Sequence, residues 1–447
     1  MAKARAKFVC QQCGEGFAKW AGKCENCGAW NSLVEQLLVA EGKSVVARSQ
    51  GQKLATEKIK DVKIDSVADR ISSGFDELDA VLGGGLMPGG VVLLAGQPGI
   101  GKSTLLMQVS AKVAAYEAVL YVSGEESASQ VKLRAERLGA KDSEKLHLAS
   151  SVSADDVATT ILDGKYKLVI VDSMQTMQMA EVASAPGTVS QITNSANIII
   201  RAAKATNTAV ILVGHVTKEG SIAGPKVLEH IVDVVLEFQG DKYGGFKLVR
   251  AQKNRYGSTT DVAIFDMKDT GLELVKNPSE ALLAERRDTD GSVILATLEG
   301  NRPLLVEIQA LVNPTSFGYP NRTASGFDLN RLKLLIAVLE RRTKLKLADK
   351  DIYINVVGGL RLDDPAADLA ICMAIASATA ERKLRRGAVA FGEVGLGGEV
   401  RSARMADKRI AEAKKLGFKY AIAPKTAKSA FVTAATDLRD ALNQHLK

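Results

Sequence analysis

The chain has 447 residues, of which 46% are apolar, and this is enough for two or three separately cored domains. Its formal net charge is +8, and residues 1–60 carry ten basic and five acidic side chains, so the basic excess is concentrated near the N-terminus. The first residues lack the apolar core of a signal peptide, and the longest apolar run, 369–380, is well short of the ~20 residues that cross a bilayer. We therefore expect a cytoplasmic protein without a membrane anchor, in which 369–380 is a buried helix.

Residues 1–37 predict a zinc finger. Two Cys-x2-Cys pairs stand ten residues apart, and each pair can present two thiolates to one tetrahedral ion; they are Cys10, Cys13, Cys24 and Cys27. Four unrelated reduced cysteines are the alternative, but only Cys372 lies outside this cluster. We expect a closed structural Zn²⁺ site, covered from water by Phe8, Trp20 and Trp30. Zinc with four thiolates lowers the local positive charge, so charge alone does not predict a nucleic-acid partner.

An α/β domain is predicted after a linker. Residues 38–60 are polar, contain glycine and show no period, as linkers do. From 61 to 278 short apolar runs alternate with helix-like stretches; the runs are 91–95, 119–122, 168–171, 209–213 and 232–238. This alternation predicts a mostly parallel sheet with helices on both of its faces.

A phosphate-binding loop is predicted between the run 91–95 and the helix-like stretch 105–115. It comprises Gly96, Gln97, Pro98, Gly99, Ile100, Gly101, Lys102, Ser103 and Thr104. The glycines let backbone amides and the helix N-terminus face a triphosphate. Lys102 would reach the outer phosphates and Ser103 would bind magnesium. The predicted ligands are therefore ATP and Mg²⁺.

Acidic residues follow two of the expected strands. Asp172 ends the run 168–171, where a second Mg²⁺-ordering carboxylate is expected; an ordinary core strand ending in an exposed aspartate is the alternative. Glu125 and Glu126 follow the run 119–122, and one of them could polarise the attacking water. We favour Glu125 and keep Glu126 open.

Two further polar positions follow later strands. His215 comes after the run 209–213 and could sense the γ-phosphate, although a purely structural histidine is an equally good interpretation. Lys253 and Arg255 stand two residues apart after a strand expected over 246–251, so they project to one side of an extended segment. They form either a solvated basic turn or, as we favour, cations supplied to ATP on a neighbouring subunit. The second interpretation implies an oligomer with ATP at its interfaces.

Residues 279–447 predict a second, α+β domain. Strands are expected at 293–297, 304–311 and 351–357, and helices at 330–342, 369–380 and 405–416, with a glycine-rich stretch at 392–398. Cys372 lies inside the apolar run 369–380 and is expected to be a small buried residue rather than a reactive thiol.

Together these motifs resemble the bacterial RadA (Sms) family of DNA repair proteins over almost the whole chain. The matching motifs are the cysteine cluster with Trp20 and Trp30, the phosphate-binding loop, and the segments 73–79, 82–86, 214–220 and 253–257. Tyr256 stands where the family usually has phenylalanine. The resemblance implies a RecA-like ATPase core and a homo-hexameric ring in the style of the DnaB replicative helicases.

The same resemblance implies a function and assigns residues to it. The expected activity is that of a DNA-dependent ATPase, a motor or helicase that promotes branch migration of recombination intermediates in partnership with the RecA recombinase. Lys102, Ser103, Glu125 and Asp172 would act on the nucleotide. Lys253 and Arg255 would couple ATP to single-stranded and branched DNA.

The C-terminal domain resembles the proteolytic domain of Lon, whose nucleophilic serine lies in a Pro-Ser-Ala-Gly turn. Here the turn carries Pro365 and Ala366, and alanine has no hydroxyl that could attack a peptide bond. The resemblance therefore implies a proteolytically inactive domain that assembles the ring. It could also present a basic surface to DNA, with a solvated basic face as the alternative; the candidates are Arg385, Arg386, Arg401 and Arg404.

Two other functions stay open. One is a non-motor ATP switch that docks repair partners through the zinc finger, and the other is an ATP-dependent protease, against which Ala366 argues. Stimulation of ATP turnover by DNA would separate the motor from the switch.

Overall fold

The computed structural model describes residues 6–10, 15–30, 32–37, 56, 58–60, 70–140, 143–216, 222–223, 227–240, 246–316 and 318–446. Met1–Ile64 and Asp65–Lys447 form two compact units. Most of the linker expected over 38–60 lies outside the described residues, so its conformation stays a prediction.

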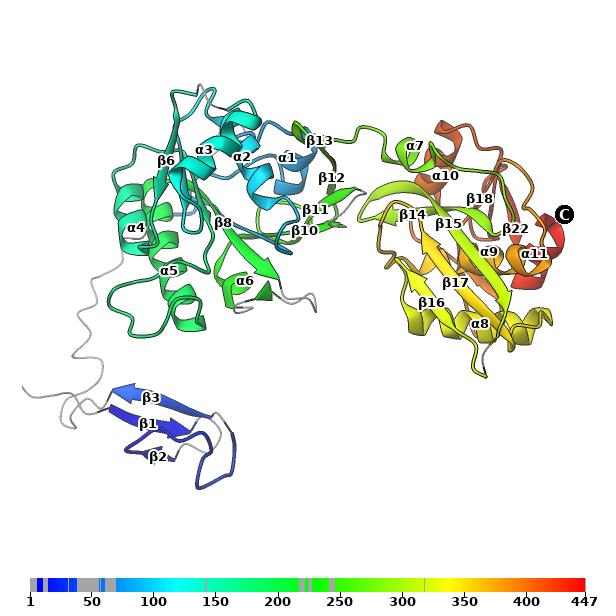
Figure 1. The fold of residues 1–447 in the computed structure, drawn as a ribbon, viewed down its shortest axis with the longest axis horizontal. Coiled ribbons are helices and arrows are strands. Elements are labelled where there is room, and N and C mark those ends of the chain that lie inside the picture. Colours follow the sequence, from blue (N-terminus) through cyan, green and yellow to red (C-terminus); the bar gives the residue numbers. More distant parts are fainter. Residues whose placement is uncertain are drawn as a thin grey trace, which may run out of the picture. The chain divides into compact units, whose positions relative to one another are not determined.

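The N-terminal unit contains a small antiparallel sheet. Its strands are β1 (Ala6–Cys10), β2 (Gly16–Phe17) and β3 (Leu33–Leu37), in the order β2-β1-β3 (Figure 1). Its core consists of Cys10, Cys24 and Leu33, with Phe8 and Phe17 packed against them. So small a cluster offers little apolar burial, which is why such segments commonly need a metal to fold.

Ten described strands of the second unit form one sheet, and six of them run parallel to one another. Its order is β13-β12-β11-β10-β4-β8-β7-β5-β6, with β9 (Ile222–Ala223) beside β8. The parallel strands are β10 (Val234–Gly240), β4 (Val91–Gly96), β8 (Ala209–Val216), β7 (Leu168–Asp172), β5 (Val119–Ser123) and β6 (Leu146–Ser150). The antiparallel extension is β11 (Lys247–Asn254), β12 (Val262–Lys268) and β13 (Gly271–Leu274). The predicted mostly parallel α/β sheet is confirmed.

Helices cover both faces of this sheet (Figure 1). One face packs on α1 (Asp76–Leu82), α2 (Lys102–Val113) and α3 (Ala128–Arg137). The other face packs on α4 (Ala154–Leu162), α5 (Val189–Thr206) and α6 (Val227–Ile231). Along β4, Val92 and Leu94 belong to the first core and Val91 and Leu93 to the second, so the strand is buried on both sides and is apolar throughout.

Most element boundaries differ from the sequence-based expectation by a few residues, and two of these differences have a clear local cause. The strand expected from residue 232 begins at Val234, because Val232 N donates to Leu228 O at 3.2 Å and continues the turn of α6. The helix expected from residue 105 begins at Lys102, because the phosphate-binding loop passes directly into its first turn.

The last part of the chain forms a seven-stranded sheet in the order β16-β17-β15-β14-β18-β21-β22. The strands are β14 (Ser292–Glu299), β15 (Arg302–Pro314), β16 (Arg322–Ser325), β17 (Lys350–Val356), β18 (Ala388–Ala390), β21 (Tyr420–Pro424) and β22 (Val432–Ala435). The longer helices are α8 (Leu329–Thr343), α9 (Asp368–Ala380), α10 (Ala406–Lys415) and α11 (Leu438–His445). A hairpin of β19 (Glu393–Val394) and β20 (Val400–Arg401) occupies the glycine-rich stretch.

The alanine-rich helix is buried as predicted. Residues 368–377 of α9 are all buried, including Cys372, and burial raises the pKa of its thiol, which keeps it protonated. Among the described helices, none combines the length and apolar character that a bilayer span requires.

The domain boundary predicted at residue 278 coincides with the first residue of α7 (Pro278–Leu283), which Asn277 caps. The apolar core of the C-terminal sheet continues past this point to Leu248, Val262 and Ile264. Arg302 and Glu77 also form an ion pair at 2.6 Å. The boundary itself stays a prediction, because packing is continuous across it.

Candidate nucleotide site and zinc site

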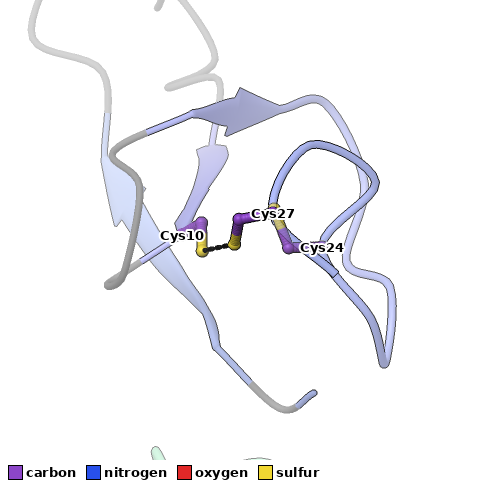
Figure 2. Close-up of side chains that lie close together, drawn as sticks. All are labelled: Cys10, Cys24 and Cys27. Carbon is purple, nitrogen blue, oxygen red and sulfur yellow. Dashed lines mark hydrogen bonds between the residues drawn. The ribbon is translucent and has the colours of Figure 1, made fainter. Parts of the chain in front are cut away.

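Three of the four predicted zinc ligands are brought together. The Sγ atoms of Cys10, Cys24 and Cys27 all lie within 4.8 Å of one another, and those of Cys10 and Cys27 are 3.6 Å apart (Figure 2). Two sulfurs bound tetrahedrally at a Zn–S distance of about 2.3 Å would lie roughly 3.8 Å apart, so the spacing fits one shared ion. Cys13 lies outside the described residues.

The aromatic cover predicted for this site is only partly correct. Phe8 and Phe17 pack against the buried cysteines, and Phe17 was not anticipated. Trp20 and Trp30 are instead 57% and 73% exposed, so the prediction that they shield the metal is wrong. Both indoles lie beside Gly22, outside the small core formed by Cys10, Cys24 and Leu33.

The predicted phosphate-binding loop joins β4 to α2. Gly101 has φ 114°, a conformation that favours glycine, and the helix begins at the next residue. A Cβ on Gly96 would lie 2.7 Å from Phe238 O, so only glycine fits at the end of the strand. The first turn of α2 has neither an acidic residue nor a side-chain cap, so its amides are available to an anion.

Lys102 lies folded over the loop. Its Nζ donates to Gly96 O at 2.8 Å and to Gln97 O at 3.0 Å, and lies 3.1 Å from His215 Nδ1. Burial lowers the pKa of Lys102 to about 8, although the negative charges of Asp172 and Glu125 act in the opposite direction. The ammonium group is thus placed among acceptors that an incoming phosphate would replace.

Ser103 and Asp172 share one partner, Tyr121. The Tyr121 hydroxyl donates to Asp172 Oδ2 at 2.6 Å, and the Ser103 side chain acts on the same hydroxyl by lowering its pKa. Burial and the Asp172 charge hold the pKa of Tyr121 well above its usual range, so it stays a donor. The strands β5 and β7 are adjacent, with Ser123 opposite Asp172, and this places Asp172 within reach of the Tyr121 hydroxyl.

The two neighbouring glutamates have different surroundings. Glu126 forms an ion pair with Arg134 of α3, which raises the pKa of that guanidinium. Glu125 accepts a hydrogen bond from Ser173, and His215 Nε2 lies 3.5 Å from the same oxygen. Glu125 therefore belongs to a chain of contacts that reaches Lys102 through His215, whereas Glu126 is neutralised by another element.

Lys253 and Arg255 are not brought to the phosphate-binding loop. Lys253 Nζ donates to Glu229 O at 2.7 Å and Val232 O at 2.8 Å, at the end of α6, while Arg255 Nη1 donates to Asp233 Oδ1 at 3.0 Å. This is the edge of the sheet where β4 begins, since Asp233 also accepts a hydrogen bond from Val91 N at 3.1 Å. The five steps from there to Gly96 span roughly 17 Å. The loop of one chain thus lies where β4 ends, and its cation pair lies where β4 begins.

Tyr121 and Asp233 are site residues that the sequence analysis missed. Tyr121 stands inside an apolar strand and gave no signal of its polar contacts. Asp233 is 2% exposed and interrupts an apolar run, which is a signal that sequence reasoning could have used. Burial and the charge of this carboxylate raise the pKa of Tyr256 to about 12.

The Lon-like turn is a packed structural element. Ala366 is 2% exposed, and its N donates to Asp364 Oδ1 at 3.1 Å. Asp364 also pairs with the fully buried Arg409 at 2.7 Å. All four candidate basic residues are exposed, and two of them form ion pairs, Arg386 with Asp288 and Arg401 with Glu399.

Comparison with family models divides the chain into three matching regions. Residues 8–35 match the model described as a rubredoxin metal binding domain, and residues 55–221 match an AAA domain. Residues 330–427 match the model for subunit ChlI of Mg-chelatase. These matches place zinc binding in the N-terminal unit and an ATPase in the parallel sheet.

Curated relatives match over nearly the whole chain. A protein of Halalkalibacterium halodurans, called DNA repair protein RadA, is 47% identical over 427 residues, which is 95% of this chain and 93% of the relative. Proteins of the same name from Bacillus subtilis and Listeria monocytogenes are each 46% identical, again over 95% of this chain and 93% of their own length. Among solved structures, the crystal structure of the RadB recombinase matches with a TM-score of 0.37 and 22% identity, covering 46% of this chain and 100% of that one.

Proposed function

The chain belongs to the family of the DNA repair protein RadA, and from this premise we propose that it is a DNA-dependent ATPase that moves branch points in recombination intermediates. We further propose a homo-hexameric ring in the cytoplasm that acts on single-stranded and branched DNA together with the RecA recombinase. The family membership and the separation of the phosphate-binding loop from Arg255 support this proposal.

Each polar group of the site has a role in this proposal. The amides of Gly99, Gly101 and the first turn of α2 would hold the triphosphate, and Lys102 would move from its carbonyl acceptors to the outer phosphates. Ser103 and Asp172 would hold the magnesium ion, whose charge offsets that of the phosphates. Glu125 would orient and polarise the attacking water.

The separation of the loop from Lys253 and Arg255 is the observation that carries the proposal. A cation at the opposite edge of the sheet cannot reach the ATP of its own chain across roughly 17 Å of strand. It can reach the ATP of another chain if copies pack head to tail, as in a ring. ATP would then lie between subunits, and its cleavage would depend on how neighbours are placed along DNA.

ATP turnover with and without single-stranded DNA tests the proposal most directly. A motor on DNA should hydrolyse ATP several-fold faster when oligonucleotide is present, and the stimulation should fall as salt rises, because phosphate contacts are screened. A non-motor switch would show equal turnover in both conditions. Because Ala366 has no hydroxyl that could attack a peptide bond, we do not propose proteolysis.

Nucleotide affinity should depend on pH through Lys102. Its pKa is about 8 in the present surroundings, and phosphate charge would raise it, so binding takes up a proton only above pH 8. Affinity for ATP with Mg²⁺ should be nearly constant between pH 7 and 8. At higher pH it should fall, and the fall should approach about tenfold for each pH unit. Calorimetry at pH 7 and 9, in buffers of different ionisation enthalpy, measures both affinity and proton uptake. Equal affinity without proton uptake at pH 9 would contradict the assignment.

A further inference from the structure

Glu125 is restrained by a neighbouring hydroxyl. Ser173 Oγ donates a hydrogen bond to Glu125 Oε1, and His215 Nε2 lies 3.5 Å from that same oxygen. A water molecule that gives up a proton to Glu125 needs a carboxylate lone pair directed toward it. Both contacts engage Oε1, so only Oε2 is left to accept a proton from water, and the hydrogen bond from Ser173 fixes the direction in which Oε2 points.

Ser173 is well placed to impose this restraint, because its own position is fixed. The residue is fully buried, and its carbonyl accepts a hydrogen bond from Thr176 Oγ1 at 2.9 Å. The adjacent Met174 N donates to Val213 O at 3.0 Å, on the neighbouring strand β8. The hydroxyl therefore has a defined location relative to the sheet rather than following the carboxylate.

The turn 173–176 and the loop that carries Glu125 are packed without spare room. Gly124 N donates to Asp172 O at 2.8 Å, and a Cβ on Gly124 would lie only 2.2 Å from Thr176 Oγ1. Because the two segments touch through backbone and a short side chain, the turn cannot shift without changing the Ser173–Glu125 contact.

The turn continues into a segment that reaches solvent. Gln178 N donates to Val152 O at 2.8 Å, and the buried Gln191 side chain donates to Val182 O at 2.8 Å and Ser184 O at 2.9 Å. Residues 185–190 that follow are all exposed. A ligand bound to this exposed segment would thus act on a chain of ordered contacts that ends at Ser173.

We propose that Ser173 is a positioning residue that restrains Glu125 until displacement of the segment 173–190 releases it. The inference rests on the proposed function, since it takes Glu125 as the residue that polarises water. The new element is a restraint on ATP turnover in the absence of DNA. It is located in the Ser173 side chain, to which the proposed function assigns no contact with the phosphates or the magnesium ion.

Ser173→Ala tests the inference in the full chain. The substitution removes one hydrogen bond to a charged group, so turnover of ATP without DNA should rise roughly tenfold. Turnover with saturating single-stranded DNA should change little, so the stimulation ratio should fall toward one, and KM for ATP should stay the same. Ser173→Thr keeps a hydroxyl and should retain at least part of the stimulation. Ser195→Ala is a matched control, because Ser195 is equally buried in the same sheet domain and its Oγ has no hydrogen-bond partner.

The outcomes separate this inference from the proposed function. If the wild type hydrolyses ATP and Ser173→Ala is no faster without DNA, or slower in both conditions, Ser173 does not restrain Glu125 and the inference fails alone. If Ser195→Ala raises turnover as much, the effect is a general loosening and the inference also fails. A wild type without turnover would overturn the proposed function, and a Ser173→Ala variant that stayed equally inactive would overturn the inference with it.

Discussion

Lys102→Ala should lower ATP turnover by roughly 10³-fold or more, the loss expected when a preorganised cation is removed from the transferring phosphate. The Lys102 side chain is 5% exposed and held between the loop carbonyls and His215, so the truncated site keeps the cradle of amides but loses its charge. Phosphate release at saturating ATP and Mg²⁺, with single-stranded DNA present, measures the effect.

A second lysine of the same helix provides the control. Lys112 lies in the last turn of α2, with its Nζ 4.6 Å from the centroid of the Phe75 ring, far from the loop. Lys112→Ala makes the same chemical change on the same helix and should leave turnover within about twofold of the wild type, as surface substitutions generally do. Comparable losses in the two variants would point to damage of α2 and not to a phosphate contact.

Arg255→Ala should preserve nucleotide binding and lower turnover by roughly 10³-fold, as the loss of an arginine finger does. The residue lies at the opposite edge of the sheet from its own phosphate-binding loop, so its removal leaves the cradle intact. Binding of a fluorescent ATP analogue and phosphate release, measured on the same preparation, separate the two steps.

Mixing the two inactive variants then tests whether the site is shared. An interface between an Arg255→Ala chain, with an intact loop, and a Lys102→Ala chain, with intact cations, carries every required group. Random one-to-one mixing in a head-to-tail ring should restore up to about a quarter of the interfaces. Absence of recovery at every ratio, in rings shown to exchange subunits, would be incompatible with a cation donated by a neighbour.

The loss in Arg255→Ala must also be distinguished from exposure of a buried charge. Asp233 is 2% exposed, and it accepts contacts from Arg255 at 3.0 Å and from Lys204 at 3.4 Å. Lys204→Ala removes the other cation from the same carboxylate without changing 253–257. If the loss came only from removing one cation from the buried Asp233 carboxylate, both variants would lose turnover and thermal stability together. Under the proposed function Lys204→Ala keeps most of its turnover.

The sequence pattern was sufficient for elements whose signal is local. The phosphate-binding loop could be placed because glycine spacing, an apolar strand before it and a helix after it occur within about twenty residues, as this motif requires. The buried helix α9 could be placed because nearly every residue is apolar or small. Three zinc ligands were likewise brought together as their spacing predicts.

Contacts between distant strands could not be derived in the same way. Tyr121 meets Asp172, and Ser173 meets Glu125, only because β5 lies beside β7, and strand order is not encoded in any local period. The cover of the zinc site was predicted wrongly at Trp20 and Trp30, because the cysteine spacing does not determine which of the nearby aromatic rings pack on the small core. The catalytic roles of Glu125, Asp172, Lys253 and Arg255 stay predictions.

Asp233 has a consequence for communication around a ring. Its carboxylate joins the first amide of β4, the strand that ends in the chain's own phosphate-binding loop, to Arg255, the group proposed to serve another subunit. In the proposed ring, turning of Arg255 toward a neighbouring triphosphate would take one cation away from this carboxylate at the base of the strand. Occupancy of one site would thereby alter the energy of the next, and linkage would require this influence to be mutual. Neighbouring subunits would then hydrolyse ATP in succession rather than at random. Directional movement along a DNA strand needs such an order.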